Sequence, residues 1–255
     1  MRDMFDKVGA EAVRDPQRSA AQGVQLPKRF YEEATAVETG HGHELRLDGR
    51  PARTPGRSPL ALAERRIAEA VAAEWAAQGE RIDPATMPLT RMANSAIDGV
   101  APRMDAVRDD ILAYAGSDLL CYRAEGPAGL VERQNAAWNP VLNRLAEEGA
   151  RFNLAEGVMP VEQPSPTLET VRGWLDEIDD PMRLTGLHVA TTITGSAILA
   201  LSVERQWIAA DEAWGAAHVD EDWNREQWGH DEIAEKARAV RRRDYDAAAL
   251  ILARP

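Results

Sequence analysis

The order of apolar and polar positions divides the chain into a short region with strand periodicity and a long region with helical periodicity. Leu45 and Leu47 alternate with polar residues, which is the spacing of a half-buried strand. The dipeptide Asp48-Gly49 follows directly and is a strong signal for a two-residue hairpin turn. The pattern therefore predicts a small antiparallel sheet over residues 28–57.

Helical spacing begins after this sheet. Ser58-Pro59 has the order of a serine N-cap followed by proline at the first helical position. The apolar stripe predicted for this helix consists of Leu60, Ile67, Val71 and Trp75. A second short helix is predicted in M-P-L-T-R-M-A-N-S-A-I-D-G, and the pattern is helical from Pro102 onward. The later predicted helices cover Trp138-Asn139-Pro140 to Glu148, Thr167 to Ile178, Met182 to Arg205, Ala210 to Trp228 and Asp231 to Leu252.

These elements predict an α+β fold, with a small N-terminal antiparallel β domain that carries a helix and a larger all-α domain resembling an orthogonal bundle. The expected divisions are a loosely structured arm at residues 1–26, a small α+β domain at 27–100 and an all-α domain at 101–255. The apolar run Leu187–Val203 is shorter than a membrane span and contains several polar residues. We therefore expect it to form a central helix buried by its neighbours.

Charge and cysteine content narrow the possible partners and locations. The 255 residues carry a formal charge of −12, which argues against nucleic acid or an anionic membrane as the main partner. The single cysteine, Cys121, excludes an internal disulfide, and its apolar setting in L-L-C-Y predicts a buried thiol. The N-terminal residues contain no apolar stretch of signal-peptide length, so we expect a cytoplasmic protein.

Known catalytic motifs are missing from the sequence. It contains neither the phosphate loop G-x-x-x-x-G-K-[ST] nor G-x-G-x-x-G after a strand. His41 and His43 could offer two imidazoles to a metal ion, but no third ligand stands nearby. His188 is expected to be a hydrogen-bonded core histidine, and Ser196 lacks the strand-turn-helix setting of a nucleophile elbow. The sequence thus predicts no cofactor, no metal site and no enzymatic activity.

The stretch D-E-D-W-N-R-E-Q-W-G-H-D-E, residues 220–232, sets two tryptophans among six carboxylates. Trp214, Glu221 and Trp228 are seven residues apart, so on one continuous helix they would form a single stripe. One interpretation is a core seam in which Glu221 reaches the rim and pairs with Arg225 four residues later. The other is a carboxylate framed by aromatic rings that meets a cation on a partner. Periodicity alone leaves both open.

Several motifs resemble those of one known family. They include K-R-F-Y, the hairpin sequence L-D-G-R-P-A-R-T-P, and V-A-A-E-W-A-A-Q-G-E-R-I-D-P-A-T-M-P-L-T-R-M-A-N-S-A-I-D. With S-D-L-L-C-Y-R-A, G-L-H-V-A and W-N-R-E-Q-W-G, they closely resemble the ATP-twelve family over about residues 28–235. Members of this family are assembly chaperones for the catalytic F-one sector of ATP synthase in mitochondria and α-proteobacteria.

The resemblance implies a protein that binds the unassembled α subunit of the F-one sector until the β subunit replaces it. It implies a β-containing domain followed by a helical domain and the use of no cofactor, and a monomer suits this role. In the family, acidic residues before an aromatic and a W-G pair form a C-terminal motif, which falls here on residues 220–229. The essential acid of that motif is placed on Glu221, with Asp222 and Glu226 as alternatives, and Asn224 replaces the usual glutamine. The expected partner-binding residues are Glu221, Asp222, Glu226, Trp228, Trp223, Trp214 and Arg225.

Two other classes of function remain possible from the residues alone. The first is a small helical hydrolase in which Glu221 and His218 do acid–base work, although no nucleophile or oxyanion donor can be identified for it. The second is a helical regulator that binds a small ligand. Binding to the isolated α subunit, but not to the β subunit, would distinguish the chaperone from both.

Overall fold

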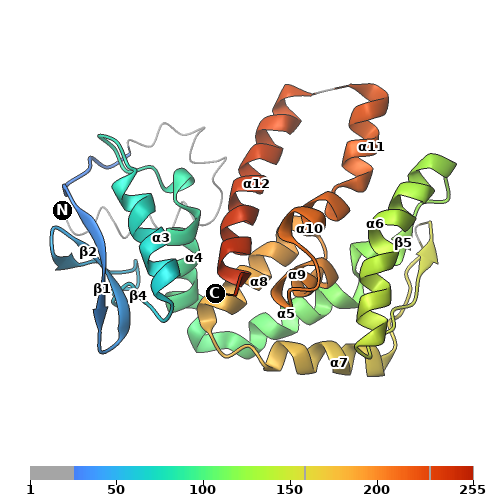
Figure 1. The fold of residues 1–255 in the computed structure, drawn as a ribbon, viewed down its shortest axis with the longest axis horizontal. Helices are drawn as coiled ribbons and strands as arrows, with labels where there is room; N and C mark the ends of the chain where they lie inside the picture. Colours follow the sequence, from blue (N-terminus) through green and yellow to red (C-terminus); the bar gives the residue numbers. More distant parts are fainter. Residues whose placement is uncertain (1–25, 158, 230, 255) are drawn as a thin grey trace. The chain divides into compact units, whose positions relative to one another are not determined.

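Residues 26–157, 159–229 and 231–254 are described by the computed structural model. The chain divides into two units, Met1–Pro102 and Arg103–Pro255. A small antiparallel sheet with helices forms the first unit, and the second is largely helical (Figure 1). The predicted α+β fold class is therefore confirmed. The arm predicted at residues 1–26 lies outside the described residues, apart from Leu26.

The sheet of the first unit has strand β2, Gly42–Leu47, at its centre. Strand β1, Ala34–Thr39, pairs with β2 along its whole length in the antiparallel sense. On the other edge, β3, Arg50–Pro51, pairs with one end of β2, and β4, Ala61–Leu62, pairs with the opposite end. The tight turn before β3 gives both Asp48 and Gly49 a positive φ, as a type I′ hairpin requires. The hairpin signal in the sequence is confirmed.

The segment around Ser58-Pro59 does not start a helix, contrary to the prediction. Pro59 forms an antiparallel bridge with Arg53, and the amide of Leu60 donates to the Ala52 carbonyl over 3.1 Å. Leu60 and Leu62 are both buried, which is the alternation of a strand. Pairing with the sheet therefore overrides the capping signal, and the helix begins only at Arg65.

Two helices complete the first unit's core. Helix α3, Arg65–Ala76, packs on β1 and β2 and buries Ile67 and Val71, as its predicted stripe requires. Helix α4, Pro88–Ser95, confirms the predicted second helix. Short turns of other helix types flank α4, at Pro84–Thr86, Ala96–Val100 and Ala101–Arg103.

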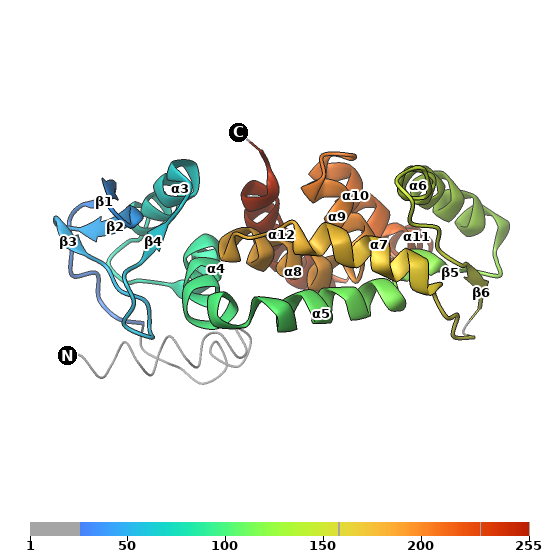
Figure 2. The same ribbon diagram turned by 90° about the horizontal axis from the view of Figure 1, so that it is seen from below.

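The second unit consists of eight α-helices and a short parallel strand pair within the described residues. The strands, β5 (Tyr122–Arg123) and β6 (Ala155–Glu156), were not predicted. A 3-10 turn, Leu119–Cys121, precedes β5. Helices α5 and α7 run side by side in both views (Figure 1, Figure 2). The helices are α5 Met104–Gly116, α6 Ala128–Glu147, α7 Ser165–Asp176, α8 Pro181–Thr194, α9 Ala197–Glu204, α10 Ala210–Ala217, α11 Val219–Trp228 and α12 Glu232–Leu252.

Helix α9 is the centre of the second unit, because all eight of its residues are buried. It contacts α5, α6, α8, α10 and α12. The side chain of Asp118 approaches its first turn and accepts hydrogen bonds from Ser196 Oγ at 2.7 Å and from the Ile198 amide at 2.9 Å. Asp118 is fully buried, and burial raises the pKa of its carboxyl to about 6 despite these hydrogen bonds. Cys121 is buried nearby, as predicted, and burial raises the pKa of its thiol to about 12.

The apolar run Leu187–Val203 forms two helices rather than the single central helix that was predicted. Gly195 takes a left-handed conformation with φ 68° and ends α8. Ser196 then caps α9 by accepting a hydrogen bond from the Leu199 amide. Most of the run is buried as expected, whereas His188, Val189, Ile193 and Gly195 are partly exposed and Thr192 is exposed. Among the described residues, no helix is both long enough and apolar enough to cross a membrane.

Helix α6 runs straight through Pro140, where the sequence predicted a new start. Gln134, Trp138, Val141 and Leu145 form one buried stripe on both sides of the proline. The packing of this stripe holds the helix together although proline removes one backbone donor. Asn139, next to this proline, accepts a hydrogen bond from Arg123 at 2.9 Å.

Candidate functional site

Helix α11, Val219–Trp228, carries most of the sequence-predicted site. Its first turn holds Asp220, Glu221 and Asp222. Negative charge at this end of a helix interacts favourably with the helix dipole. None of its residues is fully buried. Figure 1 shows α11 and the outer half of α12 extending beyond α8, α9 and α10. The helix is thus held from its sides rather than enclosed in the core.

The predicted continuous stripe of Trp214, Glu221 and Trp228 is wrong, because the helix is interrupted at His218. Its backbone leaves the helical conformation, with φ −113° and ψ 16°, so that α10 ends and α11 begins there. The imidazole Nδ1 donates to the Trp214 carbonyl oxygen over 2.7 Å and the two rings stack with centroids 3.9 Å apart. Trp214 is consequently a core residue, whereas 78% of the Trp228 surface is exposed.

One side of α11 is attached to α6. Gln134 Nε2 donates to Asp220 Oδ1 at 2.8 Å. Arg133 makes a two-pronged salt bridge to Glu226, with nitrogen–oxygen distances of 2.8 and 2.6 Å. The same guanidinium lies 4.9 Å above the Trp223 ring. Trp223 therefore rests against α6 and contributes to holding α11 in place.

The other side of α11 is linked to α12 by ion pairs. Both oxygens of Asp222 accept from the guanidinium of Arg238. Glu221 Oε2 lies 2.9 Å from Arg241 Nη2 and its other oxygen lies 3.6 Å from Arg238. Arg225 pairs with Asp222 at 3.1 Å and with Glu235 at 3.5 Å. The predicted pairing of Glu221 with Arg225 is thus replaced by contacts between the two helices.

The ion pairs of Asp222 and Glu226 favour the charged form of these two carboxylates. Partial burial raises the pKa of Asp222, but the hydrogen bonds and charges of Arg238 and Arg225 outweigh it, and the net pKa is lowered. The hydrogen bonds from Arg133 lower the pKa of Glu226. The hydrogen bond to Asp222 raises the pKa of Arg238. All three groups are therefore ionised at neutral pH.

Every carboxylate from Asp220 to Glu232 has a partner within the chain. The last two belong to the start of α12, where Asp231 accepts from the Ile233 amide and Glu232 pairs with Lys236. The apolar groups of this region are less well covered. Trp228 ends α11 and Ile233 stands in the first turn of α12, and these side chains are 78% and 79% exposed.

The geometry does not assemble the acid–base pair of the hydrolase alternative. His218 Nε2 lies 3.9 Å from Glu221 Oε2, and the imidazole is 5% exposed. Burial lowers the pKa of His218, so the ring is neutral at pH 7. Ser196 is a buried helix cap. His188 is hydrogen-bonded as predicted, with Nε2 2.6 Å from Asp110 Oδ2, but it is partly exposed rather than in the core.

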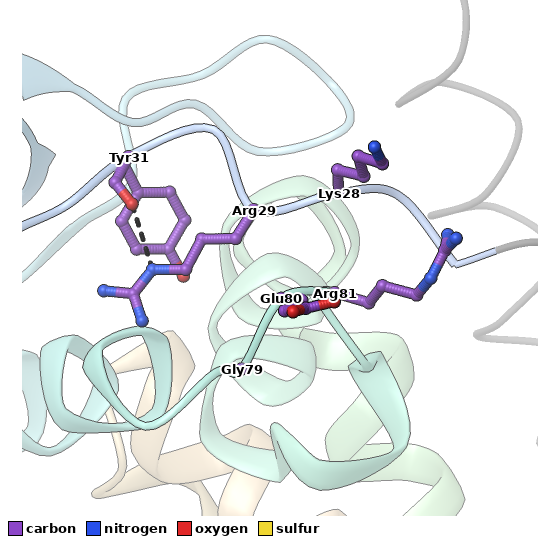
Figure 3. A pocket seen from close by; sticks show the side chains of 6 residues that line it. All are labelled: Lys28, Arg29, Tyr31, Gly79, Glu80 and Arg81. Carbon is purple, nitrogen blue, oxygen red and sulfur yellow. Dashed lines mark hydrogen bonds between the residues drawn. The ribbon is translucent and has the colours of Figure 1, made fainter.

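A depression of about 600 Å³ in the first unit is lined by several charged side chains (Figure 3). The guanidinium of Arg29 donates to the backbone carbonyls of Tyr31, Glu32 and Gln78. Arg81 donates to the Leu26 carbonyl. Tyr31 in turn donates its hydroxyl to the Trp75 carbonyl at 2.7 Å. The K-R-F-Y motif therefore fastens the chain to the end of α3, and its arginine is already engaged.

A smaller hollow of about 280 Å³ in the second unit is lined in part by the ion pair of Arg183 and Glu204. Arg183 Nε donates to Glu204 Oε1 at 2.9 Å, and the same guanidinium donates to the Leu252 carbonyl. The pair joins α8, α9 and the end of α12. Among the described residues, no group of three or more histidine, cysteine or acidic side chains is placed to hold a metal ion.

Both the sequence and the fold of the chain are similar to those of known proteins. Residues 28–146 match the family model of the ATP12 chaperone protein. A candidate chaperone from Agrobacterium tumefaciens is 43% identical, with 98% of this chain and 97% of that chain covered and a TM-score of 0.87. Atp12 from Paracoccus denitrificans is 41% identical, with coverages of 89% and 99% and a TM-score of 0.81. The chain belongs to the ATP12 chaperone family.

The ATP12 family model stops at residue 146, whereas the structural matches continue across the helical unit. A further match is a variant of the Paracoccus Atp12p in which one aspartate is replaced by lysine, 39% identical with a TM-score of 0.81. It covers 89% of this chain and 98% of its own. The resemblance to the ATP-twelve family that the sequence motifs suggested is confirmed, and so is the α+β architecture that it implied.

Proposed function

We propose that this ATP12 chaperone binds the unassembled α subunit of the ATP synthase F-one sector and masks its interface until the β subunit replaces it. A lone subunit exposes an interface that is apolar and would self-associate in water. A reversible cover prevents this without nucleotide, cofactor or a bond-making step. The binding takes place in the cytoplasm and joins one chaperone to one α subunit.

The observation that carries this proposal is the surface of the α11–α12 pair. Helix α11 is firmly held yet buries none of its residues, and it ends in the exposed Trp228. Exposed tryptophan on a rigid support is typical of binding hot spots. Glu221, Asp222, Trp223, Arg225 and Glu226 belong to the same helix, and Trp214 supports it from the core. The formal charge of −12 also favours a basic protein face over nucleic acid.

A co-purification experiment with separate subunits tests the proposal. The tagged chaperone is incubated with purified α subunit, with purified β subunit, or with both. We expect retention of α alone, no retention of β alone, and less retained α when both are present. Retention of β, or equal failure with either subunit, would refute the proposed partner. Turnover of a small molecule by the pure protein would instead favour the enzyme alternative.

A further inference from the structure

The outer half of α12 differs from the rest of the helical unit in how it is supported. Residues Asp231 to Lys236 are all exposed, so this part of the helix has no core of its own. The backbone of α12 packs mainly on α8 and α9, whereas that of α11 packs mainly on α6. Long arginine side chains on α12 therefore form the connection between its outer half and α11.

The ion pairs between the two helices have the register of an antiparallel hairpin. Arg225 and Glu235, Asp222 and Arg238, and Glu221 and Arg241 are 10, 16 and 20 residues apart in sequence. In sequence, the midpoint between the two members of each pair lies within one residue of position 230. Three successive links thus run along the two helices, and we call the pairs Asp222–Arg238 and Glu221–Arg241 the clasp.

The clasp reduces the negative charge that Glu221 and Asp222 can present to a cation on a partner. Carboxylates that are already held by arginines have little free charge to give to a cation on another protein. The two most exposed large hydrophobic side chains of the described residues, Ile233 and Trp228, lie instead at the end where α11 and α12 join. Contact at that end would be mainly apolar, which matches the interface that an unassembled subunit exposes.

We propose that Arg238 and Arg241 are positioning residues for partner binding: by holding Asp222 and Glu221 they fix the outer half of α12 against α11, so that Ile233 and Trp228 form one apolar contact surface. The occupant of that surface is the apolar interface of the α subunit, so this inference rests on the proposed function. The carboxylates act through the clasp and not by touching the partner.

The direction in which one substitution changes the affinity for the α subunit distinguishes this arrangement from direct contact between the carboxylates and the partner. Arg241→Ala removes the principal partner of Glu221. If Glu221 met a cation on the α subunit, freeing it would leave binding unchanged or make it tighter. If Glu221 works through the clasp, binding should weaken about threefold to fivefold, the size of a partly exposed ion pair. Lys236→Ala is the matched control, because Lys236 is exposed and pairs with Glu232 of the same helix.

Exchanging the charges of Glu221 and Arg241 tests whether the ion pair between them is needed for binding to the α subunit. Glu221→Lys places a cation opposite Arg241 and should weaken binding to the α subunit. Adding Arg241→Glu restores an opposite-charge pair and should recover part of the affinity. Hydrogen exchange should follow the same order, with amides of residues 233–241 exchanging fastest in Glu221→Lys and more slowly in the double variant. Direct contact predicts no recovery, because the carboxylate then stands on the wrong helix.

The apolar surface is tested by truncating its members. Trp228→Ser should weaken binding about thirtyfold or more, as loss of a hot-spot tryptophan does. Ile233→Ser should weaken it less, and Val240→Ser, a less exposed position on the same helix, should have no effect. Unchanged binding by Trp228→Ser, or undiminished binding by Arg241→Ala, would overturn the inference. Failure of the unaltered protein to bind the α subunit would overturn the proposed function instead.

Discussion

The far edge of the Trp223 indole occupies the space beside Gly129, where a Cβ atom would lie 2.8 Å from Cη2 of the ring. Gly129 stands in the first turn of α6, and Trp223 stands in α11. The absence of a side chain at Gly129 therefore allows the two helices to meet. Arg133, also on α6, places its guanidinium over the same indole ring, 4.9 Å from the ring centroid.

A methyl group at this glycine should destabilise the protein. Gly129→Ala gains up to about 1 kcal/mol of helix propensity, but overpacking against Trp223 costs about 1–3 kcal/mol. Gly173→Ala in α7 is the matched control, because nothing lies within 4 Å of its added Cβ. Urea unfolding should show a loss for the first variant and a gain for the second, and equal gains for both would contradict the contact.

Glu74 lies in V-A-A-E-W, at the start of the longest motif that resembles the family, and its hydrogen bonds lead to a second prediction. Its carboxylate accepts hydrogen bonds from the amides of Leu89 and Thr90 at 2.7 and 2.8 Å and so caps α4. Glu74→Ala should lower the free energy of unfolding by about 1–2 kcal/mol. Glu69→Ala removes only an exposed pair with Arg65 and should change it by less than about 0.5 kcal/mol. Similar effects of the two substitutions would show that the cap is unimportant.

The buried carboxyl of Asp118 predicts a pH dependence of stability. Burial raises its folded pKa to about 6 from a model-compound value of 3.8. Because the folded pKa is raised, its contribution to stability is complete below about pH 4 and is lost as the pH rises through 6. Relative to Asp118→Asn, the unaltered protein should lose about 2 kcal/mol between pH 4 and pH 7. Denaturation curves of both proteins across this range provide the check, and a constant difference would contradict it.

The parts of the fold that the sequence predicted correctly depend on local chemistry. Asp48-Gly49 tolerates the positive φ of a tight hairpin turn, so the turn is visible without tertiary information. The Gly195-Ser196 pair carries an equally local signal, a left-handed helix end followed by an N-cap, and it would have predicted the break between α8 and α9. The long apolar run concealed it.

The errors arose where tertiary contacts override local preference. Pro59 enters the sheet because Leu60 and Leu62 are buried beside β2, and α6 passes through Pro140 because its buried stripe continues. The break at His218 depends on its stacking and hydrogen bond with Trp214. Spacing by seven residues could not reveal this, since it assumes a continuous helix.

The candidate site was located by sequence, but its internal contacts were not. The acidic residues and tryptophans of residues 220–229 do lie on one partly exposed helix. Their partners lie on other helices: Arg238 and Arg241 on α12 are 16 and 20 residues from the acids they bind, and Arg133 on α6 is 93 residues from Glu226. Contacts between helices at such separations depend on the packing of the whole unit. Ile233 was likewise missed, although its place in a polar helix start was a signal of exposure.

The central claim, reversible masking of the α subunit, is tested most directly by sedimentation velocity with a fluorescently labelled chaperone. With α subunit alone, the label should sediment as a complex of one chaperone and one α subunit. Addition of excess β subunit should return the label to the position of the free chaperone, while α moves into larger assemblies with β. A label that never leaves the free position with α, or that stays bound after β is added, would contradict the account.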